Sequence, residues 1–290
     1  MNISQTRKNF RASLSSGKPL QFVGAFNAMV AQLIEQYGFD GVYGSGAVIS
    51  NALGLPDVGL TTLSEVAHFT SDISSKVKLP VIVDADTGFG GPGNTARTIA
   101  LLEQTGATGC HIEDQVNPKR CGHLEGKELV SSQDMTQKIK AAVQARTDPN
   151  FILIARTDAK GVEGIDAAID RAKAYVDAGA DMIFPEALHN VKEMEAFRKA
   201  VKVPLLLNMT EFGKSDLLSI DQIAVLGYEV VIYPVTLQRL AMFAVEEGLK
   251  SIKASGSQEG LLHKMQTRKR LYEVLKYDYY IEQDKKLGKS

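Results

Sequence analysis

Eight short apolar runs recur along the chain, and each of them ends in polar or charged residues. The runs span residues 20–27, 41–46, 79–86, 109–115, 151–158, 181–187, 203–210 and 229–234. Most are rich in β-branched residues and nearly continuous in hydrophobicity, which is typical of strands buried on both faces of a parallel sheet. Amphipathic helical patterns such as "GIDAAIDRAKAYVDAGA" lie between them. The sequence therefore predicts alternating strands and helices.

The ends of the expected helices resemble one another. They read "QYGFDGVY", "QTGATGCHI", "DAGADMIF" and "VLGYEVVIY". Each places a glycine where a left-handed helix cap is wanted and starts a strand two or three residues later. Eight such units in about 250 residues favour a (β/α)8 barrel. A doubly wound open sheet is the competing architecture.

The two ends of the chain exceed what a minimal barrel needs. Residues 1–18 predict an N-terminal helix, and two helical segments, about 239–254 and 258–283, follow the eighth strand where closure needs only one. We therefore predict one barrel domain over 1–290 with a C-terminal helical extension from about residue 239. The surplus is expected to pack on a neighbouring subunit.

Charge and cysteine usage exclude several classes of protein. The 290 residues carry 33 basic and 34 acidic side chains, so no electrostatic footprint for nucleic acid is present. No apolar run approaches the roughly 20 residues that span a bilayer, and the start lacks a secretory signal. Two cysteines in such a chain favour free thiols in a reducing compartment. We expect a cytoplasmic protein without nucleic-acid or membrane partners.

Polar residues stand at the carboxyl ends of the predicted strands, where a parallel barrel builds its active site. Charged side chains close four consecutive strands, which ordinary loop entries do not readily explain. The residues at these ends are Ser45, Gly46, Asp84, Asp86, Glu113, Arg156, Asp158, Glu186, Asn208 and Thr210.

Asp84 and Asp86 predict a metal site. Residues two apart on a strand leave the same face, and two converging carboxylates repel unless a cation or proton lies between them. Asp57 and Glu113 could complete the shell. Oxygen ligands without clustered histidine or cysteine favour Mg²⁺ or Mn²⁺ over Zn²⁺. The following "TGFGGPGN" lacks the spacing of a phosphate loop and predicts a flexible turn.

The loop sequence "PKRCGH" carries the candidate reactive thiol, Cys121, beside Lys119, Arg120 and His123. It lies in the long segment 116–132, and loops of that length in compact domains are often lids. Cationic neighbours lower a thiol pKa from about 8.5 towards neutrality, which suits a proton donor. Cys110, near the start of a strand, is expected to be a buried structural residue.

The motifs "VDADTGFG", "HIEDQ", "PKRCGH", "ARTDA", "FPEA", "NMTEFG" and "MQTR" together resemble the isocitrate lyase and phosphoenolpyruvate mutase superfamily. The resemblance runs from about residue 5 to residue 282. Isocitrate lyases typically read Lys-Lys-Cys-Gly-His and are much longer. Mutases, decarboxylases and hydrolases of the superfamily generally lack the thiol loop. The pattern is most similar to members that cleave (2S,3R)-2-methylisocitrate to pyruvate and succinate in propionate catabolism.

This resemblance implies roles for individual residues. Asp84 and Asp86 would hold Mg²⁺, with Asp57 and Glu113 in support, and Cys121 would protonate the succinate carbanion. Tyr43 is the candidate base, although a buried structural tyrosine is the competing interpretation. The positions that match substrate contacts are Ser45, Gly46, Ala47, Gly122, Arg156, Glu186, Asn208, Thr210, Arg239 and Arg268.

Three further expectations come from the same resemblance. His123 and Glu113 would orient the loop and metal-bound waters. Phe184, Ile232 and Pro234 would form the apolar niche for the substrate methyl group. Family members are commonly homotetramers that exchange the final barrel helix. Related substrates left open are isocitrate, dimethylmalate and oxaloacetate, and a non-catalytic ligand-binding barrel is the alternative from another class.

Overall fold

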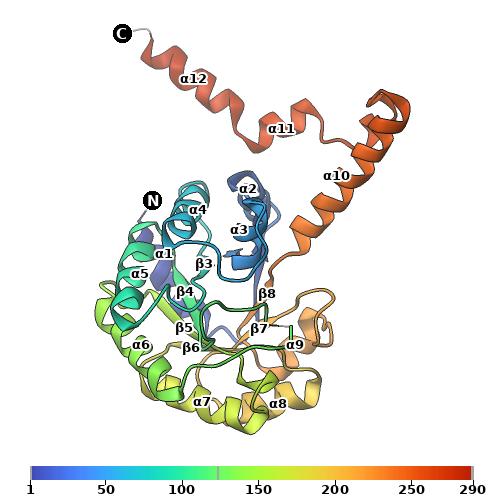
Figure 1. Cartoon of the computed structure of the whole chain (residues 1–290). Helices are drawn as coiled ribbons and strands as arrows, with labels where there is room; N and C mark the ends of the chain where they lie inside the picture. Colours follow the sequence, from blue (N-terminus) through green and yellow to red (C-terminus); the bar gives the residue numbers. More distant parts are fainter. Residues whose placement is uncertain (1, 123, 289–290) are drawn as a thin grey trace. The chain divides into compact units, whose positions relative to one another are not determined.

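A computed structural model describes residues 2–122 and 124–288, and among these residues eight parallel strands form one sheet (Figure 1). The strands are β1 (Leu20–Gly24), β2 (Gly41–Gly44), β3 (Val81–Asp84), β4 (Gly109–Glu113), β5 (Ile152–Thr157), β6 (Met182–Pro185), β7 (Leu206–Asn208) and β8 (Val230–Tyr233). Each lies inside a predicted run, so the eight strand predictions are confirmed with shorter ends.

The sheet closes into a barrel. Its strand order is β6-β5-β4-β3-β2-β1-β8-β7. The two end strands meet through a parallel bridge between Ile183 and Leu205, and the Ile183 N–H donates to the Pro204 carbonyl at 3.0 Å. A closed parallel sheet confirms the (β/α)8 barrel and rules out the doubly wound open sheet.

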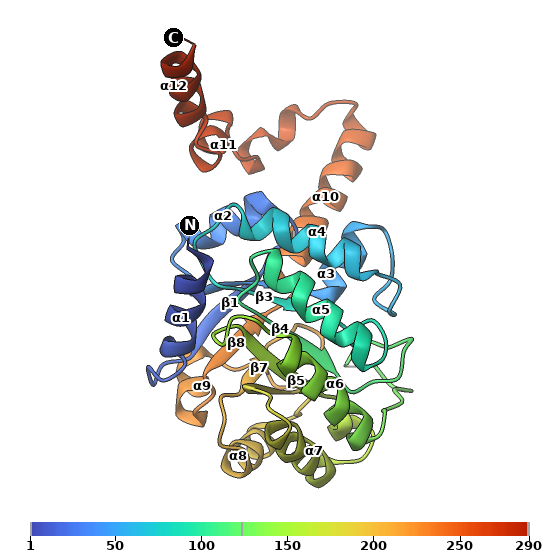
Figure 2. The ribbon, with the colours of Figure 1, turned by 90° about the vertical axis from the view of Figure 1, so that its left-hand side faces the viewer.

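Helices surround the barrel on its outside (Figure 2). They are α1 (Ile3–Ser13), α2 (Ala28–Gln36), α3 (Gly46–Ala52), α4 (Leu63–Ser74), α5 (Pro92–Gln104), α6 (Ser132–Ala145), α7 (Ile165–Asp177), α8 (Val191–Ala200) and α9 (Ile220–Leu226). Glycine follows helices at the predicted exits, with φ of 77° at Gly38, 87° at Gly106, 109° at Gly179 and 75° at Gly227. Glycine tolerates this left-handed conformation without a Cβ clash.

Alternating strand residues supply two separate cores. Phe22 and Ile82 belong to a cluster inside the barrel, whereas the next residue along β3, Val83, packs in the layer between strands and helices. Phe10 of α1 and Leu14, the residue that caps this helix, join the interior cluster, so the predicted N-terminal helix closes the amino end of the barrel. The carboxyl ends of the strands are left for the polar residues.

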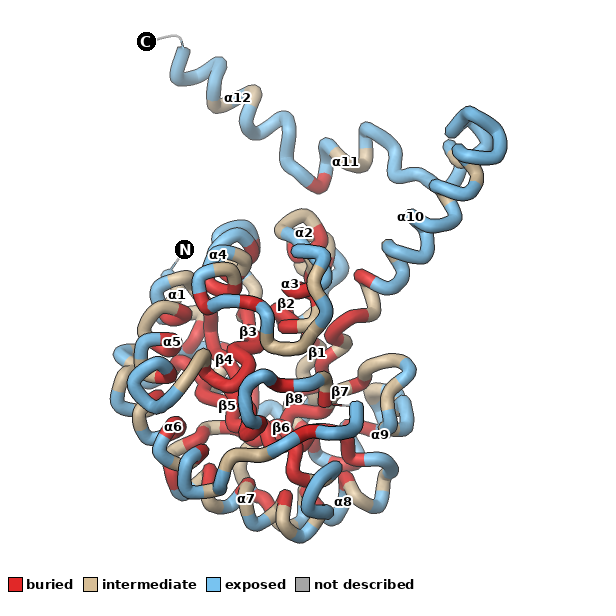
Figure 3. Tube along the Cα trace, viewed as in Figure 1, coloured by how far each residue is buried: buried red, intermediate tan, exposed pale blue. Residues whose placement is uncertain are grey.

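The chain divides into two compact units, with the boundary after Thr236. The second unit contains α10 (Thr236–Ser255, which begins at the boundary), a 3-10 turn (Glu259–Lys264), α11 (Arg268–Val274) and α12 (Tyr277–Leu287). Most of its residues are exposed (Figure 3).

The first predicted C-terminal helix is confirmed, but the prediction of one continuous helix over 258–283 is wrong. Thr267 starts a new helix by accepting a hydrogen bond from the Arg270 N–H at 3.2 Å. Lys276, with a left-handed φ of 55°, then separates α11 from α12. Within the described residues no helix is both long and apolar enough to cross a membrane.

Candidate active site

The paired aspartates lie at the carboxyl end of β3, in a turn rather than along a continuing strand. Asp84 ends the strand and Asp86 adopts a left-handed φ of 47°, and each is only 5% exposed. Asp84 accepts hydrogen bonds from the Gly46 N–H at 3.2 Å and the Asp86 N–H at 2.9 Å. A Cβ on Gly46 would lie 2.7 Å from Asp84 Oδ2 and 3.3 Å from Asp86 Oδ1, so both carboxylates face this glycine.

Lys119 places its ammonium group among these carboxylates. Its Nζ lies 2.9 Å from Asp86 Oδ1 and forms a second, short ion pair with Asp57. Burial opposes the charged lysine, but Glu113, Asp84, Asp86 and Asp57 together hold its pKa well above the usual value. The structure therefore brings Asp57 to the predicted metal site through this loop lysine, which sequence reasoning had placed beside the thiol.

The carboxylates retain capacity for a further cation. Burial, followed by the charge of Asp84, raises the pKa of Asp86 to about 6. Asp86 Oδ1 and the Glu113 carboxylate form ion pairs with Lys119 and Arg156, and beyond these they make no hydrogen bond among the described residues. Within those same residues, no three His, Cys, Asp or Glu side chains converge as a preformed metal cage. A site that offers only a small number of protein oxygen ligands suits Mg²⁺, because this ion usually keeps several waters.

Tyr43 on β2 and His111 on β4 form a buried pair. The Tyr43 hydroxyl lies 2.7 Å from His111 Nε2, and His111 Nδ1 lies 3.7 Å from Asp84 Oδ1. Burial lowers the pKa of His111 to about 4, so the imidazole is neutral at pH 7. Burial and the charge of Asp84 raise the pKa of Tyr43 well above its usual value. A free tyrosinate is therefore unfavourable here, whereas proton exchange with His111 is geometrically available.

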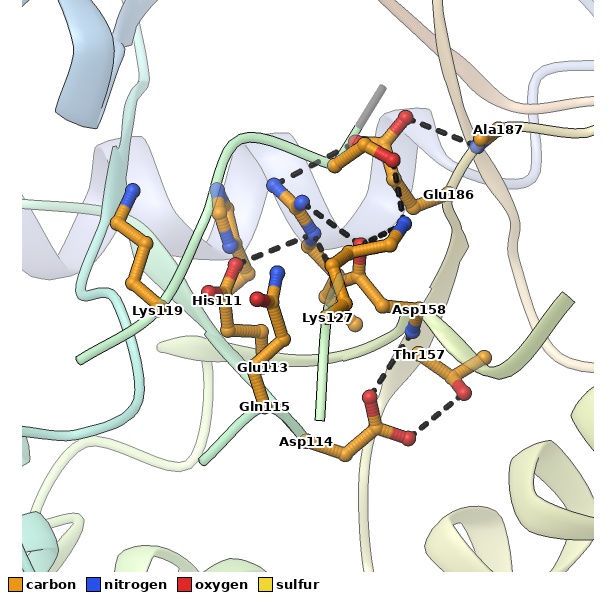
Figure 4. A network of polar contacts seen from close by, with 12 residues as sticks. His111, Glu113, Asp114, Gln115, Lys119, Lys127, Thr157, Asp158, Glu186 and Ala187 are labelled. Atoms are coloured by element: carbon orange, nitrogen blue, oxygen red, sulfur yellow. Dashed lines mark hydrogen bonds and ion pairs between the residues drawn. The ribbon is translucent and has the colours of Figure 1, made fainter. Parts of the chain in front are cut away.

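Arg156 on β5 is surrounded by three acidic side chains, Glu113, Asp158 and Glu186, which are labelled in Figure 4. Its Nε lies 2.9 Å from Asp158 and 3.2 Å from Glu113, and its NH1 lies 3.4 Å from Glu186. Burial raises the pKa of Glu113 well above its usual value, and the nearby Arg156 and Lys119 cations only partly oppose this. The guanidinium fork thus connects the ends of β4, β5 and β6 in one buried network.

The remaining predicted substrate positions lie at or just after the carboxyl ends of β2 and β7. Asn208 donates to the carboxylate of Glu186 at 3.3 Å, while its own Oδ1 is buried without a donor among the described residues. Ser45 precedes α3 and is buried, and Ala47 and Thr210 are half-buried. Amide, hydroxyl and carboxylate groups therefore come together where a carboxylic acid substrate needs orientation.

The three residues of the predicted methyl niche are buried. Phe184 and Ile232 are buried in the interior cluster, and Pro234 is buried at the end of β8. The Phe184 ring meets His111 edge-on, with centroids 5.3 Å apart. Of the three, Phe184 thus places an apolar ring directly beside the polar groups.

Cys121 lies in the loop between β4 and α6 and is half-buried. The adjacent Gly122 is buried, and a Cβ there would lie 2.4 Å from Arg156 and 2.4 Å from Glu186. The thiol loop therefore reaches the site as predicted. Cys110 is fully buried in β4, and its prediction as a structural residue is confirmed.

Three predicted site residues are not placed in this cluster. Arg239 and Arg268 belong to the second unit, whose position relative to the barrel is not defined. His123 lies outside the described residues. Their proposed roles remain predictions.

Sequence reasoning missed two residues that the structure brings to the site, His111 and Lys127, and it placed Lys119 beside the thiol rather than among the carboxylates. His111 precedes Glu113 by two positions on one strand, and this alternation could have indicated a shared inward face. Lys127 pairs with Asp158 at 3.0 Å across the barrel mouth, and no local pattern indicates that contact.

Comparison with known proteins identifies the family. The family model of phosphoenolpyruvate phosphomutase matches residues 10–253. The chain therefore belongs to the phosphoenolpyruvate mutase and isocitrate lyase superfamily. It is similar to a solved 2,3-dimethylmalate lyase of that superfamily, with a TM-score of 0.92 and 33% identity over 98% of this chain and 95% of that one.

Curated relatives give a narrower likeness. A protein of Corynebacterium glutamicum named probable 2-methylisocitrate lyase 1 is 57% identical over 281 residues, covering 97% of this chain and 92% of that protein. The 2-methylisocitrate lyase of Aeropyrum pernix is 50% identical over 267 residues, covering 92% and 86% respectively. The similarity extends through both compact units.

Proposed function

We propose that this protein is a carbon–carbon lyase that cleaves (2S,3R)-2-methylisocitrate to pyruvate and succinate. The near-full-length identity to proteins named 2-methylisocitrate lyase carries this conclusion. The buried acidic cluster beside a thiol loop supports it, because the reaction needs both a cation site and a proton donor.

Asp84 and Asp86 would hold Mg²⁺, or Mn²⁺, with Asp57 and Glu113 supporting the shell. Asp86 Oδ1 and the Glu113 carboxylate fit such a cation because, among the described residues, only ion pairs with Lys119 and Arg156 balance them. The position of the Lys119 ammonium between Asp57 and Asp86 also marks a place for positive charge. A bound ion supplies Lewis-acid polarisation of the hydroxyl and carboxylate that become pyruvate. On binding, it would compete with the Lys119 ammonium for Asp86.

Cleavage begins with loss of the proton from the substrate hydroxyl. Tyr43 would take that proton at its oxygen while passing its own to Nε2 of His111, 2.7 Å away. This relay avoids a free tyrosinate, and although burial also disfavours the imidazolium, the nearby Asp84 charge favours that cation. The imidazolium formed would face Asp84 Oδ1 at 3.7 Å.

The bond between the hydroxyl-bearing carbon and its neighbour then breaks, and a carbonyl forms on pyruvate. The electron pair of the broken bond remains on the carbon that becomes part of succinate. Cys121 would give the proton on its Sγ to that carbon. Arg156, Asn208 and the backbone at Gly122 would orient the substrate carboxylates. Ser45, Gly46 and Ala47 would contact the pyruvate end.

The decisive experiment is product analysis with several substrates. Methylisocitrate, isocitrate, 2,3-dimethylmalate and oxaloacetate are compared with and without Mg²⁺, since 2,3-dimethylmalate lyase is a structural neighbour. A methyl in an apolar pocket is worth about 1–3 kcal/mol, so kcat/KM for methylisocitrate should exceed that for isocitrate by about tenfold or more. A preference for another substrate would overturn the proposal.

The second unit supports a further proposal, a homotetramer in which C-terminal helices are exchanged between subunits. On α10 the apolar side chains of Leu240, Phe243 and Leu249 are each more than 60% exposed. Large exposed apolar surface of this kind is typical of an interface. A monomeric mass in sedimentation at micromolar concentration would contradict it.

A further inference from the structure

The loop that carries Cys121 is tied at its base. Gln115 and Leu129 form an antiparallel bridge, the Val116 N–H donates to the Glu128 carbonyl at 2.8 Å, and the Val130 N–H donates to the Asp114 carbonyl at 2.9 Å. These bonds fix the neck of the loop but not its tip. The position of the thiol therefore depends on contacts made further along the loop.

Gln115 holds the backbone on the N-terminal side of the thiol. Its side-chain Nε2 donates to the Arg120 carbonyl at 2.9 Å, and its Oε1 accepts from the Arg120 N–H at 2.9 Å. Gln115 is only 1% exposed, so solvent does not compete for these bonds. One buried amide thus satisfies both backbone groups of the residue before Cys121.

Lys127 holds the backbone on the C-terminal side of the thiol. Its ammonium donates a short hydrogen bond to the Gly122 carbonyl and pairs with Asp158 Oδ1 at 3.0 Å (Figure 4). The side chains of Lys127 and Asp158 are 4% and 0% exposed. A buried cation bonded to a carbonyl is a strong, directional contact.

Asp158 is itself rigidly placed in the barrel. Its carboxylate accepts from Arg156 at 2.9 and 3.2 Å, and its backbone N–H donates to Asp114 at 2.9 Å. The anchor for the loop tip is therefore the same carboxylate that orients the site arginine. A displacement of Lys127 would free the loop tip while Arg156 keeps its place.

The backbone at Gly122 packs very closely against the side chains of Arg156 and Glu186. A Cβ at that position would lie 2.4 Å from Arg156 NH2 and from Glu186 Cγ, much closer than side-chain atoms approach. The backbone beside the thiol therefore contacts the charged network directly. A release of the Gly122 carbonyl would move Cys121 away from that network.

We propose that Lys127 is a positioning residue that locks the loop tip against the barrel and so sets the place of the Cys121 thiol, with Gln115 as its counterpart on the other side. The lysine acts on the Gly122 carbonyl and does not itself exchange a proton with the substrate. This assignment rests on the proposed role of Cys121 as proton donor.

The test compares Lys127→Met, Lys127→Arg and the control Lys214→Met in the full-length enzyme. Lys214 lies near the same loop and pairs with Glu125 at only 3.9 Å, with both side chains exposed. Iodoacetamide modification of Cys121 is followed by mass spectrometry from pH 6 to pH 10. The plateau rate at high pH reports access to the thiolate, whereas the midpoint reports its pKa.

Lys127→Met should raise the plateau rate about tenfold or more, and Lys127→Arg should restore most of the protection. In turnover, Lys127→Met should lower kcat by about 100-fold with KM changed less than threefold, because misplacement of about 1 Å costs that much. Lys214→Met should match the wild type in both measurements. An unchanged plateau rate in a folded Lys127→Met protein would overturn the proposal.

A second variant covers the case in which Lys127→Met does not fold. Gln115→Met removes both hydrogen bonds to Arg120 and should also raise the plateau rate. An unchanged rate would overturn the proposal that Gln115 and Lys127 hold the backbone on both sides of the thiol. Cys121→Ser separates this inference from the proposed function. If that variant turns over at the wild-type rate while Lys127→Met still exposes the thiol, the loop anchor stands and the proton-donor role fails.

Discussion

The buried charged groups at the two ends of the barrel differ in how completely their hydrogen bonds are satisfied. At the amino end, Arg7 of α1 donates to the Ala107 carbonyl at 3.0 Å and the Glu103 carbonyl at 2.6 Å. The Glu103 carboxylate accepts from the backbone and hydroxyl of Thr147, each at 3.0 Å. At the carboxyl end, Asp86 Oδ1 and the Glu113 carboxylate make ion pairs with Lys119 and Arg156 but no further hydrogen bond among the described residues.

This difference separates charges that hold the fold from charges that await a ligand. A buried group whose hydrogen bonds are complete adds to stability, whereas one left incomplete costs free energy. At the amino end, the charges of Arg7 and Glu103 are satisfied within the protein. The carboxyl end carries a cost that a cation and a substrate would relieve.

The largest expected effect comes from removal of the metal. Chelation should abolish turnover, because Asp84 and Asp86 would no longer present a cation to the substrate hydroxyl. Mg²⁺ or Mn²⁺ should restore it, as measured by pyruvate release. Full activity in a metal-stripped preparation would show that the carboxylates at the carboxyl end do not need a cation for turnover.

Cys121→Ser should have the next largest effect. Replacement of the thiol by a far weaker acid should lower kcat by at least about 100-fold, the lower end for general acid catalysis. Substrate affinity, measured by calorimetry in the presence of Mg²⁺, should change little. Cys110→Ser is the internal control and should at most lower stability, since that thiol is fully buried in β4. A wild-type rate for Cys121→Ser would mean that the loop covers the substrate but supplies no proton.

Arg7→Met tests the amino end. Loss of a buried cation should leave Asp148 and the Ala107 and Glu103 carbonyls without their donor, and should lower the free energy of unfolding by about 3–5 kcal/mol. Urea unfolding measures this, and kcat should stay within about twofold of the wild type at 25 °C. Reduced kcat with unchanged stability would mean that the amino end takes part in function.

Asp86→Asn tests the carboxyl end. It should raise the stability of the metal-free protein, whereas Arg7→Met should lower stability. The raised pKa of Asp86, about 6 against an ordinary 3.8, means that the folded metal-free protein keeps this proton longer than the unfolded chain. Ionisation therefore costs stability progressively between about pH 4 and pH 6, and fully above pH 6. Asparagine avoids this cost.

The metal-free Asp86→Asn protein should thus be more stable than the wild type at pH 7.5, by about 1–3 kcal/mol. Near pH 4 the two proteins should unfold at similar urea concentrations. Unfolding in EDTA at both pH values measures the difference. Equal stability at pH 7.5 would contradict the view that this end of the barrel carries unrelieved charge.

Much of this architecture could be predicted from local sequence. Continuous β-branched runs indicate buried parallel strands, and glycines with φ above 70° at Gly38, Gly106 and Gly227 mark the helix exits. The positions of Asp84, Glu113, Arg156 and Glu186 at strand ends followed from the same periodicity, because a closed parallel barrel brings all its carboxyl ends to one face.

The partners of these side chains were decided only by the tertiary structure. Lys119 meets Asp57 across 62 residues of sequence, and Tyr43 meets His111 across 68. Strand periodicity predicts which face a residue occupies, but a hydrogen bond or ion pair depends on barrel closure and on the path of the loop 116–131. For the same reason, the sequence by itself determined the barrel and the type of site, whereas the folded chain decided that Lys127 anchors the thiol loop to Asp158.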